Sequence, residues 1–257
     1  LQCHKLAPPK DTGATTAQRG FIMSRIVLSA FLGLLLMTVH AAAQDLVVIA
    51  SSASGIKTGQ MVKSGAALDV PAGANVTLVS QSGKTIMLKG PFSGVPGGGG
   101  GGGGDKSLVS SLSKLLSASG SKSASLGAMR SGIAKEPDNP WAVDIGRSGT
   151  HCVPAGGPVT LWRGDAAKAS SIRIKNMTAG AKAELAWPAG AKTLGWPAEA
   201  TVADNNTYLL RLKDKKSATK VVLHLVPAEL PSAPHKAVWM AEKGCVKQAK
   251  HLLSALN

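Results

Sequence analysis

Two cysteines and a neighbouring histidine are the residues whose types could support covalent chemistry. His151 directly precedes Cys152, and the second cysteine of the same half of the chain is Cys245. A cysteine activated by a histidine can act as a nucleophile. Consecutive residues of a strand point to opposite faces, however, so His151 and Cys152 are not expected to touch. In an oxidising compartment the two cysteines favour a disulfide, and a reactive thiol beside His151 is the alternative.

A run of glycines at 97–104, followed by Asp105-Lys106-Ser107, resembles a phosphate-binding loop. That loop needs Gly-Lys-Ser without interruption, so that backbone amides and the lysine meet the same phosphate. Asp105 places a negative charge where the phosphate would lie. We therefore predict no nucleotide site here.

Other short patterns also lack the partners that their chemistry requires. Ser111-x-x-Lys114 and the segment 57–59 (Lys-Thr-Gly) match two elements of penicillin-recognising enzymes, but in reversed order and without a Ser-Asp-Asn element. The histidines are dispersed, and the cysteine spacing fits no zinc pattern. We predict a protein that is not an enzyme, with no cofactor and no metal site.

A secretory signal peptide is indicated by residues 23–43. Met23 is followed by Arg25, by an apolar run at 26–39, and by small residues at Ala41 and Ala43. This order of positive, apolar and Ala-x-Ala segments is typical of a cleaved signal, and the apolar run is shorter than the roughly 20 residues of a membrane span. We expect cleavage after Ala43, a mature protein that does not span the membrane, and a bacterial periplasmic or secreted location. Residues 1–22 are expected to be upstream sequence outside the functional protein.

The charge of the chain limits its partners. The formal net charge is +15, with a single tyrosine and three phenylalanines. Because aromatic stacking platforms beside basic patches are missing, we expect no nucleic acid partner. A basic protein outside the cytoplasm can instead meet an envelope protein or an anionic cell-wall or membrane surface.

The elements that must position these residues begin with a small β module at 45–95. Short apolar segments alternate with Gly and Pro turns, which predicts strands near 46–50, 60–62, 67–70, 76–79 and 85–89. The strand at 85–89 ends at Gly90-Pro91.

This module resembles the FecR-type extracytoplasmic domain. The matching residues are Gly59-Gln60, Val62, Gly65, Leu68, Pro71-Ala72-Gly73-Ala74, Val76-Thr77-Leu78, Gly83-Lys84-Thr85, Leu88 and Gly90-Pro91. The family includes regulators that couple an outer signal to an anti-sigma segment. The resemblance therefore implies, as one alternative, an accessory sensor domain of an envelope signalling system.

Residues 96–140 are predicted to be a Gly-rich linker that carries one short helix at 106–118. Eight consecutive glycines have a high backbone entropy cost in any packed element. Asp105 is a candidate N-cap, and leucines at 108, 112, 115 and 116 recur at helical spacing. Because such a linker transmits no orientation, we expect the β units on its two sides to move independently.

The second half is predicted to be an immunoglobulin-like β-sandwich at 141–230 followed by a helical segment at 231–257. Strands are expected near 141–145, 158–162, 171–175, 181–187, 207–213 and 220–226. Trp187 is a candidate core residue, and Tyr208 opens the penultimate strand. The terminal helices are expected to break at Gly244 and to share one apolar stripe, formed by Val238, Ala241, Cys245, Ala249, Leu252 and Leu256.

Four short segments of this half resemble the C-terminal half of signal-peptide-bearing FecR-domain proteins of proteobacteria. They are Ser148-Gly149-Thr150-His151-Cys152, Pro158-Val159-Thr160-Leu161-Trp162-Arg163, Leu223-His224-Leu225-Val226-Pro227 and Ala241-Glu242-Lys243-Gly244-Cys245. The resemblance implies export and this architecture, and it carries no activity. The sequence as a whole predicts a mainly β, exported, non-enzymatic envelope protein that acts as a binding or scaffolding module.

Overall fold

A computed structural model describes residues 44–97, 106–118 and 136–257. The described part of the chain is mainly β, with three short helices, and it belongs to one compact unit that covers 42–257. The predicted fold class is confirmed. The signal segment, the glycine run with Asp105, and residues 119–135 of the predicted linker lie outside the described residues.

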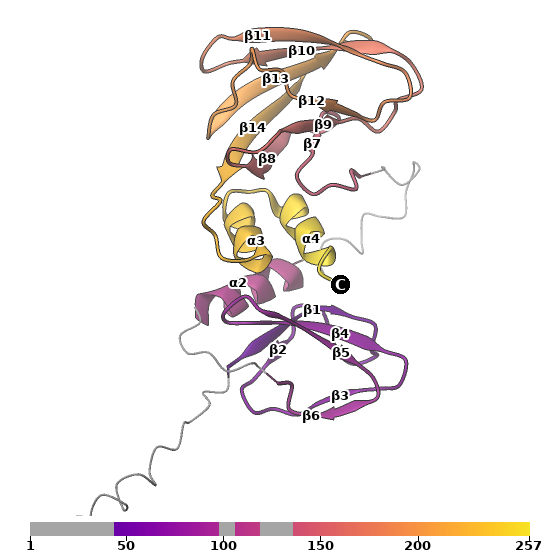
Figure 1. The fold of residues 1–257 in the computed structure, drawn as a ribbon, viewed down its shortest axis with the longest axis vertical. Helices are drawn as coiled ribbons and strands as arrows, with labels where there is room; N and C mark the ends of the chain where they lie inside the picture. Colours follow the sequence, from indigo (N-terminus) through magenta and orange to yellow (C-terminus); the bar gives the residue numbers. More distant parts are fainter. Residues whose placement is uncertain (1–43, 98–105, 119–135) are drawn as a thin grey trace, which may run out of the picture. The chain divides into compact units, whose positions relative to one another are not determined.

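The first β unit consists of two small antiparallel sheets (Figure 1). Its strands are β1 (Leu46–Ser51), β2 (Met61–Val62), β3 (Leu68–Val70), β4 (Asn75–Ser80), β5 (Thr85–Lys89) and β6 (Phe92–Gly94). One sheet has the order β2-β1-β4-β5, and β3 pairs with β6. All five strands expected in this unit are present, and β6 is the addition.

Strand β1 is buried on both of its faces, which explains its uninterrupted apolar sequence. Leu46 and Val48 pack into the core of the first β unit, whereas Val47 and Ile49 belong to a different core cluster, shared with the helices. Strands covered on both sides carry continuous apolar runs instead of alternating ones. The turn after β5 is equally constrained, because a side chain at Gly90 would overlap the carbonyl of Pro71.

The second β unit is a sandwich of two sheets. Its strands are β7 (Val143–Asp144), β8 (Gly149–Pro154), β9 (Thr160–Trp162), β10 (Ser170–Asn176), β11 (Lys182–Trp187), β12 (Thr193–Gly195), β13 (Asn206–Leu212) and β14 (Thr219–Val226). The five-stranded sheet has the order β11-β10-β13-β14-β8, and the three-stranded sheet has the order β12-β9-β7. The six predicted strands are present. Strands β8 and β12 were not predicted, and β8 pairs in parallel with β14.

The core of the sandwich depends on three aromatic residues whose polar atoms are bonded to the backbone. The Tyr208 hydroxyl donates to the carbonyl of Thr201 at 2.9 Å and accepts the N–H of Ala203 at 3.0 Å. This back-bonded tyrosine on the penultimate strand is a feature of immunoglobulin-like sandwiches. Trp187, which is fully buried as predicted, packs in the same core, and Trp196 meets Tyr208 edge-on with ring centroids 5.0 Å apart.

The two Trp-Pro-Ala segments of the sequence form the same local structure. The indole N–H of Trp187 donates to the carbonyl of Ala191 at 2.9 Å, and that of Trp196 donates to the carbonyl of Ala200 at 2.6 Å. In both cases the acceptor lies four residues after the tryptophan. Each turn therefore satisfies the one polar atom of a side chain that packs into the core.

Three helices complete the fold: α2 (Lys106–Ser117), α3 (Ala233–Glu242) and α4 (Val246–Ser254). Helix α2 matches the predicted helix. Gly244, with φ of 87°, separates α3 from α4 as predicted. The six residues of the predicted stripe all lie at one core cluster: Cys245, Ala249 and Leu252 are buried members, and Val238, Ala241 and Leu256 are partly buried and pack against it. The fully buried residues of α3 itself are Pro234, Ala237 and Met240, which the stripe did not include.

The predicted disulfide is present between Cys152 on β8 and Cys245 at the start of α4. Both cysteines are buried. The Gln248 side chain reinforces this junction: its Oε1 accepts the N–H of Cys152 at 2.7 Å, and its Nε2 donates to the carbonyls of Cys152 at 2.9 Å and Pro140 at 2.8 Å. Helix α4 is thus joined to β8 by one covalent bond and by hydrogen bonds.

One core cluster contains residues of both β units, which contradicts the expectation that they move independently. Its buried members are Val47, Ile49, Val79, Leu108, Val109, Leu112, Leu115, Cys152, Val226, Ala237, Met240, Cys245, Ala249, Leu252 and Leu253. They come from β1 and β4, from the three helices, and from β8 and β14. Helix α2 also bonds the first β unit directly, since the Ser113 hydroxyl donates to the carbonyl of Gly59 at 2.6 Å. The helix inside the predicted linker therefore supplies contacts that a glycine run alone cannot.

Within the described ranges, none of the helices is both long and apolar enough to cross a membrane.

Candidate functional site

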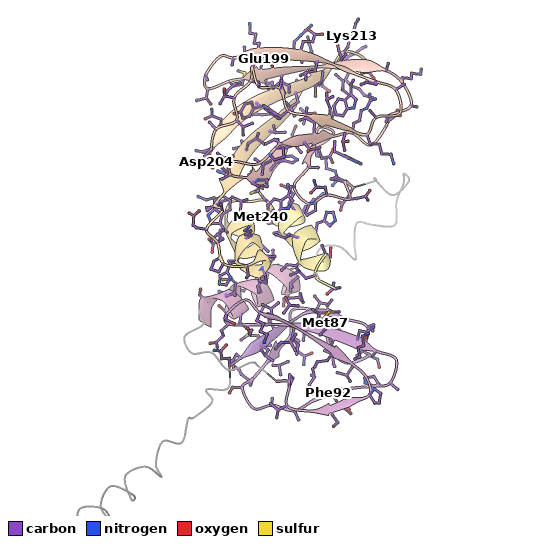
Figure 2. The ribbon with its side chains drawn as sticks, viewed as in Figure 1. Met87, Phe92, Glu199, Asp204, Lys213 and Met240 are labelled. Carbon is purple, nitrogen blue, oxygen red and sulfur yellow. A yellow bond between two sulfur atoms is a disulfide. The ribbon has the colours of Figure 1, made fainter. Side chains whose placement is uncertain are left out.

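The outward face of the five-stranded sheet carries a concentration of basic side chains. Along β10 the residues alternate between buried and exposed, with Ile172 and Ile174 inside and Arg173 and Lys175 outside. The same period of two operates on the neighbouring strands. We define the cationic face as the exposed residues Arg173, Lys175, Lys182, Arg211, Lys213 and Lys220. Lys213, at the end of β13, is labelled in Figure 2 among the side chains that project from this part of the sandwich.

The register of the sheet places like charges directly opposite each other. Arg173 of β10 is the cross-strand partner of Arg211 on β13, and Lys175 of β10 is the partner of Lys182 on β11. Side chains at such positions have Cβ atoms about 4.5–5.5 Å apart, and like charges there are destabilising. The fold thus places two like-charged pairs on one exposed surface.

One acidic residue interrupts the cationic face. Glu184 on β11 forms an ion pair with Arg173 at 3.0 Å and accepts a hydrogen bond from the Ser171 hydroxyl at 3.0 Å. The hydrogen bond from Arg173 is the main cause of its lowered pKa, followed by that from Ser171. Glu184 orients Arg173 and leaves the partner of Arg173, Arg211, without an ion pair among the described residues.

A shallow hollow of about 280 Å³ opens on this face. Five basic side chains and one acidic side chain line it, together with Ser171. The basic ones are Arg173, Arg211, Lys213, Lys215 and Lys216. Cationic side chains gathered in this way can attract and hold an anion.

A second hollow, of about 270 Å³, lies beside the disulfide and is lined by His151, Gln248 and His251, among others. The His151 Nδ1 atom is buried and has no hydrogen-bond partner among the described residues. Burial lowers the pKa of His151, and the backbone of Gly149 and the charge of Asp144 act in the opposite direction. Burial is the largest of these effects, so the pKa of His151 lies below its usual value.

The structure separates the residues that could have formed a Cys–His pair. Cys152 belongs to the core cluster of the helices, while the next residue, Val153, belongs to the sandwich core. His151 and Val153 share a face of β8, as alternating positions do. The Cys152 sulfur is bonded to Cys245, so the alternative of a reactive thiol beside His151 is not realised.

The Ser-x-x-Lys and Lys-Thr-Gly elements of the sequence lie close together in the structure. Helix α2 does approach the segment 57–59, but Ser113 makes the contact with Gly59. Ser111 is two residues away on the helix, and residues at that spacing do not face the same side. Within the described segments, no cluster of three or more His, Cys, Asp or Glu side chains could hold a metal ion. The cleavage-site residues Ala41 and Ala43 lie outside the described residues.

Sequence reasoning missed the cationic face as a site. Each lysine and arginine is visible in the sequence, and the strands β10, β11 and β13 were predicted. The signal lay in the alternation itself, because residues 171–175 read Ser-Ile-Arg-Ile-Lys and so place both cations on one face. Which cations oppose each other across strands depends on register, which the sequence pattern does not supply.

Comparisons with known proteins give no family for this chain. No protein-family model matches it. No curated protein matches it either. The resemblance to FecR-type domains and the sensor role that it implies therefore stay predictions, and the function is argued from the geometry.

Proposed function

We propose that the chain is an exported, non-enzymatic binding module of the bacterial cell envelope, and that it binds a linear polyanion through the cationic face. The observation that carries the proposal is the pair of like-charged cross-strand contacts, Arg173 with Arg211 and Lys175 with Lys182. With a polyanion bound, both cations of each pair would be attracted to the ligand, and this attraction would offset their mutual repulsion. Cleavage before Gln44 leaves the mature chain with a net charge of +12, which favours the approach of such a ligand from a distance.

The geometry favours a polymer over a flat anionic surface. Successive outward residues of a strand are about 6.5–7 Å apart, and neighbouring strands are about 4.8 Å apart. The cations therefore form a closely spaced strip, across the four neighbouring strands β11, β10, β13 and β14, that suits a chain with one charge per repeat. An acidic polysaccharide or a polyphosphate of the envelope has this chemistry.

The expected export of the protein agrees with a role in the cell envelope. The proposal relies on the signal segment with Ala41 and Ala43, and a disulfide suits an oxidising compartment. We expect the mature protein to begin at Gln44. Intact-mass measurement of protein secreted or released from the periplasm checks this, and recovery of peptides from 26–39 in that material contradicts it.

Removing one cation from each repulsive pair is the test of the binding face. In the double variant Arg211→Gln/Lys175→Gln, we expect affinity for polygalacturonate or linear polyphosphate to fall by about 10- to 30-fold, since a basic residue near an anionic surface contributes about 1 kcal/mol. The melting temperature should stay unchanged or rise, because the repulsion is relieved. Loss of affinity without loss of stability distinguishes a binding face from a structural one.

The matched control removes two exposed lysines of the first β unit, Lys84→Gln/Lys89→Gln, and changes the net charge equally. It should weaken binding far less. Equal losses in both double variants would show that only the net charge matters and would overturn the proposed face. Binding to vesicles of phosphatidylglycerol and phosphatidylcholine, with none to either polymer, would overturn the polymer as the ligand.

A further inference from the structure

Arg163, the residue after β9, is a buried cation with only neutral partners. It is 4% exposed. Its Nε donates to the carbonyl of Ala191 at 3.0 Å, its Nη2 donates to the carbonyl of Pro188 at 2.7 Å, and its guanidinium carbon lies 4.8 Å from the centre of the Trp187 ring. These contacts hold the turn that follows β11, and they leave the positive charge without a counter-ion.

Buried charges in proteins are usually paired with an opposite charge. No carboxylate among the described residues lies within 4.0 Å of Arg163, the distance of an ion pair. Asp214 interacts with it from farther away. The pKa of Asp214 is lowered mainly by the hydrogen bond from the Ser170 hydroxyl, and the charge of Arg163 is among the lesser causes.

One amino group of Arg163 is left over. The carbonyls of Ala191 and Pro188 occupy Nε and Nη2, and Nη1 forms no hydrogen bond within the described chain. Nη1 is also not among the fully buried polar atoms that lack a partner, so it keeps some accessible surface. Arg163 lines a hollow of about 350 Å³, and an anion in this hollow would lie beside the guanidinium.

The hollow beside Arg163 holds further groups that suit an anion. Lys168 and Lys215 supply positive charge, and Ser217 brings a hydroxyl. The Thr219 hydroxyl also lines the hollow, but it donates to the carbonyl of Ile145 at 2.6 Å. Its two carboxylates are already engaged. Asp214 accepts from Ser170, and Asp165 accepts the N–H of Ala167 at 3.0 Å in its own loop. Lys215 also lines the hollow of the cationic face, so the two hollows adjoin at this residue.

We propose that the hollow beside Arg163 is a binding site for a single oxyanion group, a phosphate or a carboxylate, with Nη1 of Arg163 as its principal donor. The site stands on its own geometry. Its role as the place where one charged substituent of a polymer is recognised rests on the proposed function. A guanidinium matches the spacing of oxyanion oxygens, and a hydrogen bond between two charged groups is stronger than one between neutral groups.

The test measures binding of two small probes, inorganic phosphate and glucuronate, to the mature protein by calorimetry. Whichever probe binds identifies the source of the oxyanion. In Arg163→Met the affinity should fall about 10- to 100-fold, the range for a lost charged hydrogen bond. This variant also removes the hydrogen bonds to the carbonyls of Pro188 and Ala191. A second variant is therefore needed that leaves Arg163 unchanged.

Ser217→Trp fills the hollow from its exposed rim, and Ala218→Trp adds the same bulk next to it at a residue that does not line the hollow. Probe binding should be lost in the first and kept in the second. Absence of probe binding to the wild type, or equal binding to both tryptophan variants, would overturn the site. If the probes fail while polymer binding still depends on Arg211 and Lys175, the site is refuted and the proposed function stands. If neither probe nor polymer binds, both fail.

Discussion

Reduction of the Cys152–Cys245 disulfide is expected to lower the melting temperature of the mature chain by roughly 8–20 °C. The bond joins residues 93 positions apart. For a loop of that length, the chain-entropy model gives a stabilisation of about 4–5 kcal/mol. A protein of this size loses roughly 2–4 °C per kcal/mol, so a fall of roughly 8–20 °C is expected for the reduced protein or for Cys245→Ser.

The loss should concentrate at the C-terminal helices. Helix α4 has nine residues, and helices this short depend on tertiary contacts for their stability. Amide hydrogen exchange should therefore accelerate at 233–254, while β10 and β13 remain protected. The variant Cys152→Ala/Cys245→Ala is the control, because its melting temperature should not respond to reductant. Two free thiols per mature chain, titrated in denaturant after purification without reductant, would refute the bond.

Truncation of Leu112 on α2 is the second change with a large expected effect. Leu112 is fully buried in the cluster that contains residues of both β units. Replacing a buried leucine by alanine costs about 2–5 kcal/mol, which corresponds to a fall of roughly 4–20 °C in melting temperature. Lys114→Ala, at an exposed position of the same helix, should change it little.

The same variant tests whether the β units share one core. If they do, thermal unfolding of the wild type is a single transition, and Leu112→Ala shifts all of it. Two separate transitions, of which only one responds to the substitution, would restore the expectation that the units on either side of the glycine run behave independently. Limited proteolysis of the folded protein is a second test of independence. Independent β units would yield two stable fragments, and units that share a core would not.

Much of the fold was accessible from the sequence because local signals agreed with tertiary ones. Glycine and proline turns delimited the strands of the first β unit, and helical leucine spacing gave α2. Trp187 was recognisable as a core residue because a large aromatic side chain buries much apolar area, and Tyr208 marked the start of the penultimate strand. Gly244 marked the helix break, since only glycine adopts its positive φ without cost.

The sequence pattern could not predict the features of the fold that depend on residues distant in the chain. Strand β8 reads Gly-Thr-His-Cys-Val-Pro, a weak strand sequence, and it is held by parallel pairing with β14 and by Gln248. The continuous apolar run of β1 did contain a signal that went unused: burial on both faces requires a second covering layer. That layer is the helices, and its recognition would have argued against independent β units.

The candidate site was less accessible than the fold for the same reason. Opposition of Arg173 and Arg211 is a property of register, and the isolation of Arg163 depends on where Pro188 and Ala191 place their carbonyls. Composition indicated a basic surface and an anionic partner. It could not distinguish dispersed cations from two directly opposed pairs.

The Gln248 side chain has a consequence for self-association. Strand β8 is the last strand of its sheet, and an unprotected last strand offers free N–H and C=O groups to the strand of another chain. The carboxamide of Gln248 presents one acceptor and one donor to Cys152, as an incoming strand would, and so blocks that addition at the middle of β8. The adjacent disulfide holds α4, and with it the Gln248 side chain, beside β8. Oxidation in the folded protein therefore does more than stabilise a helix: it closes an edge through which unoxidised chains could pair and aggregate.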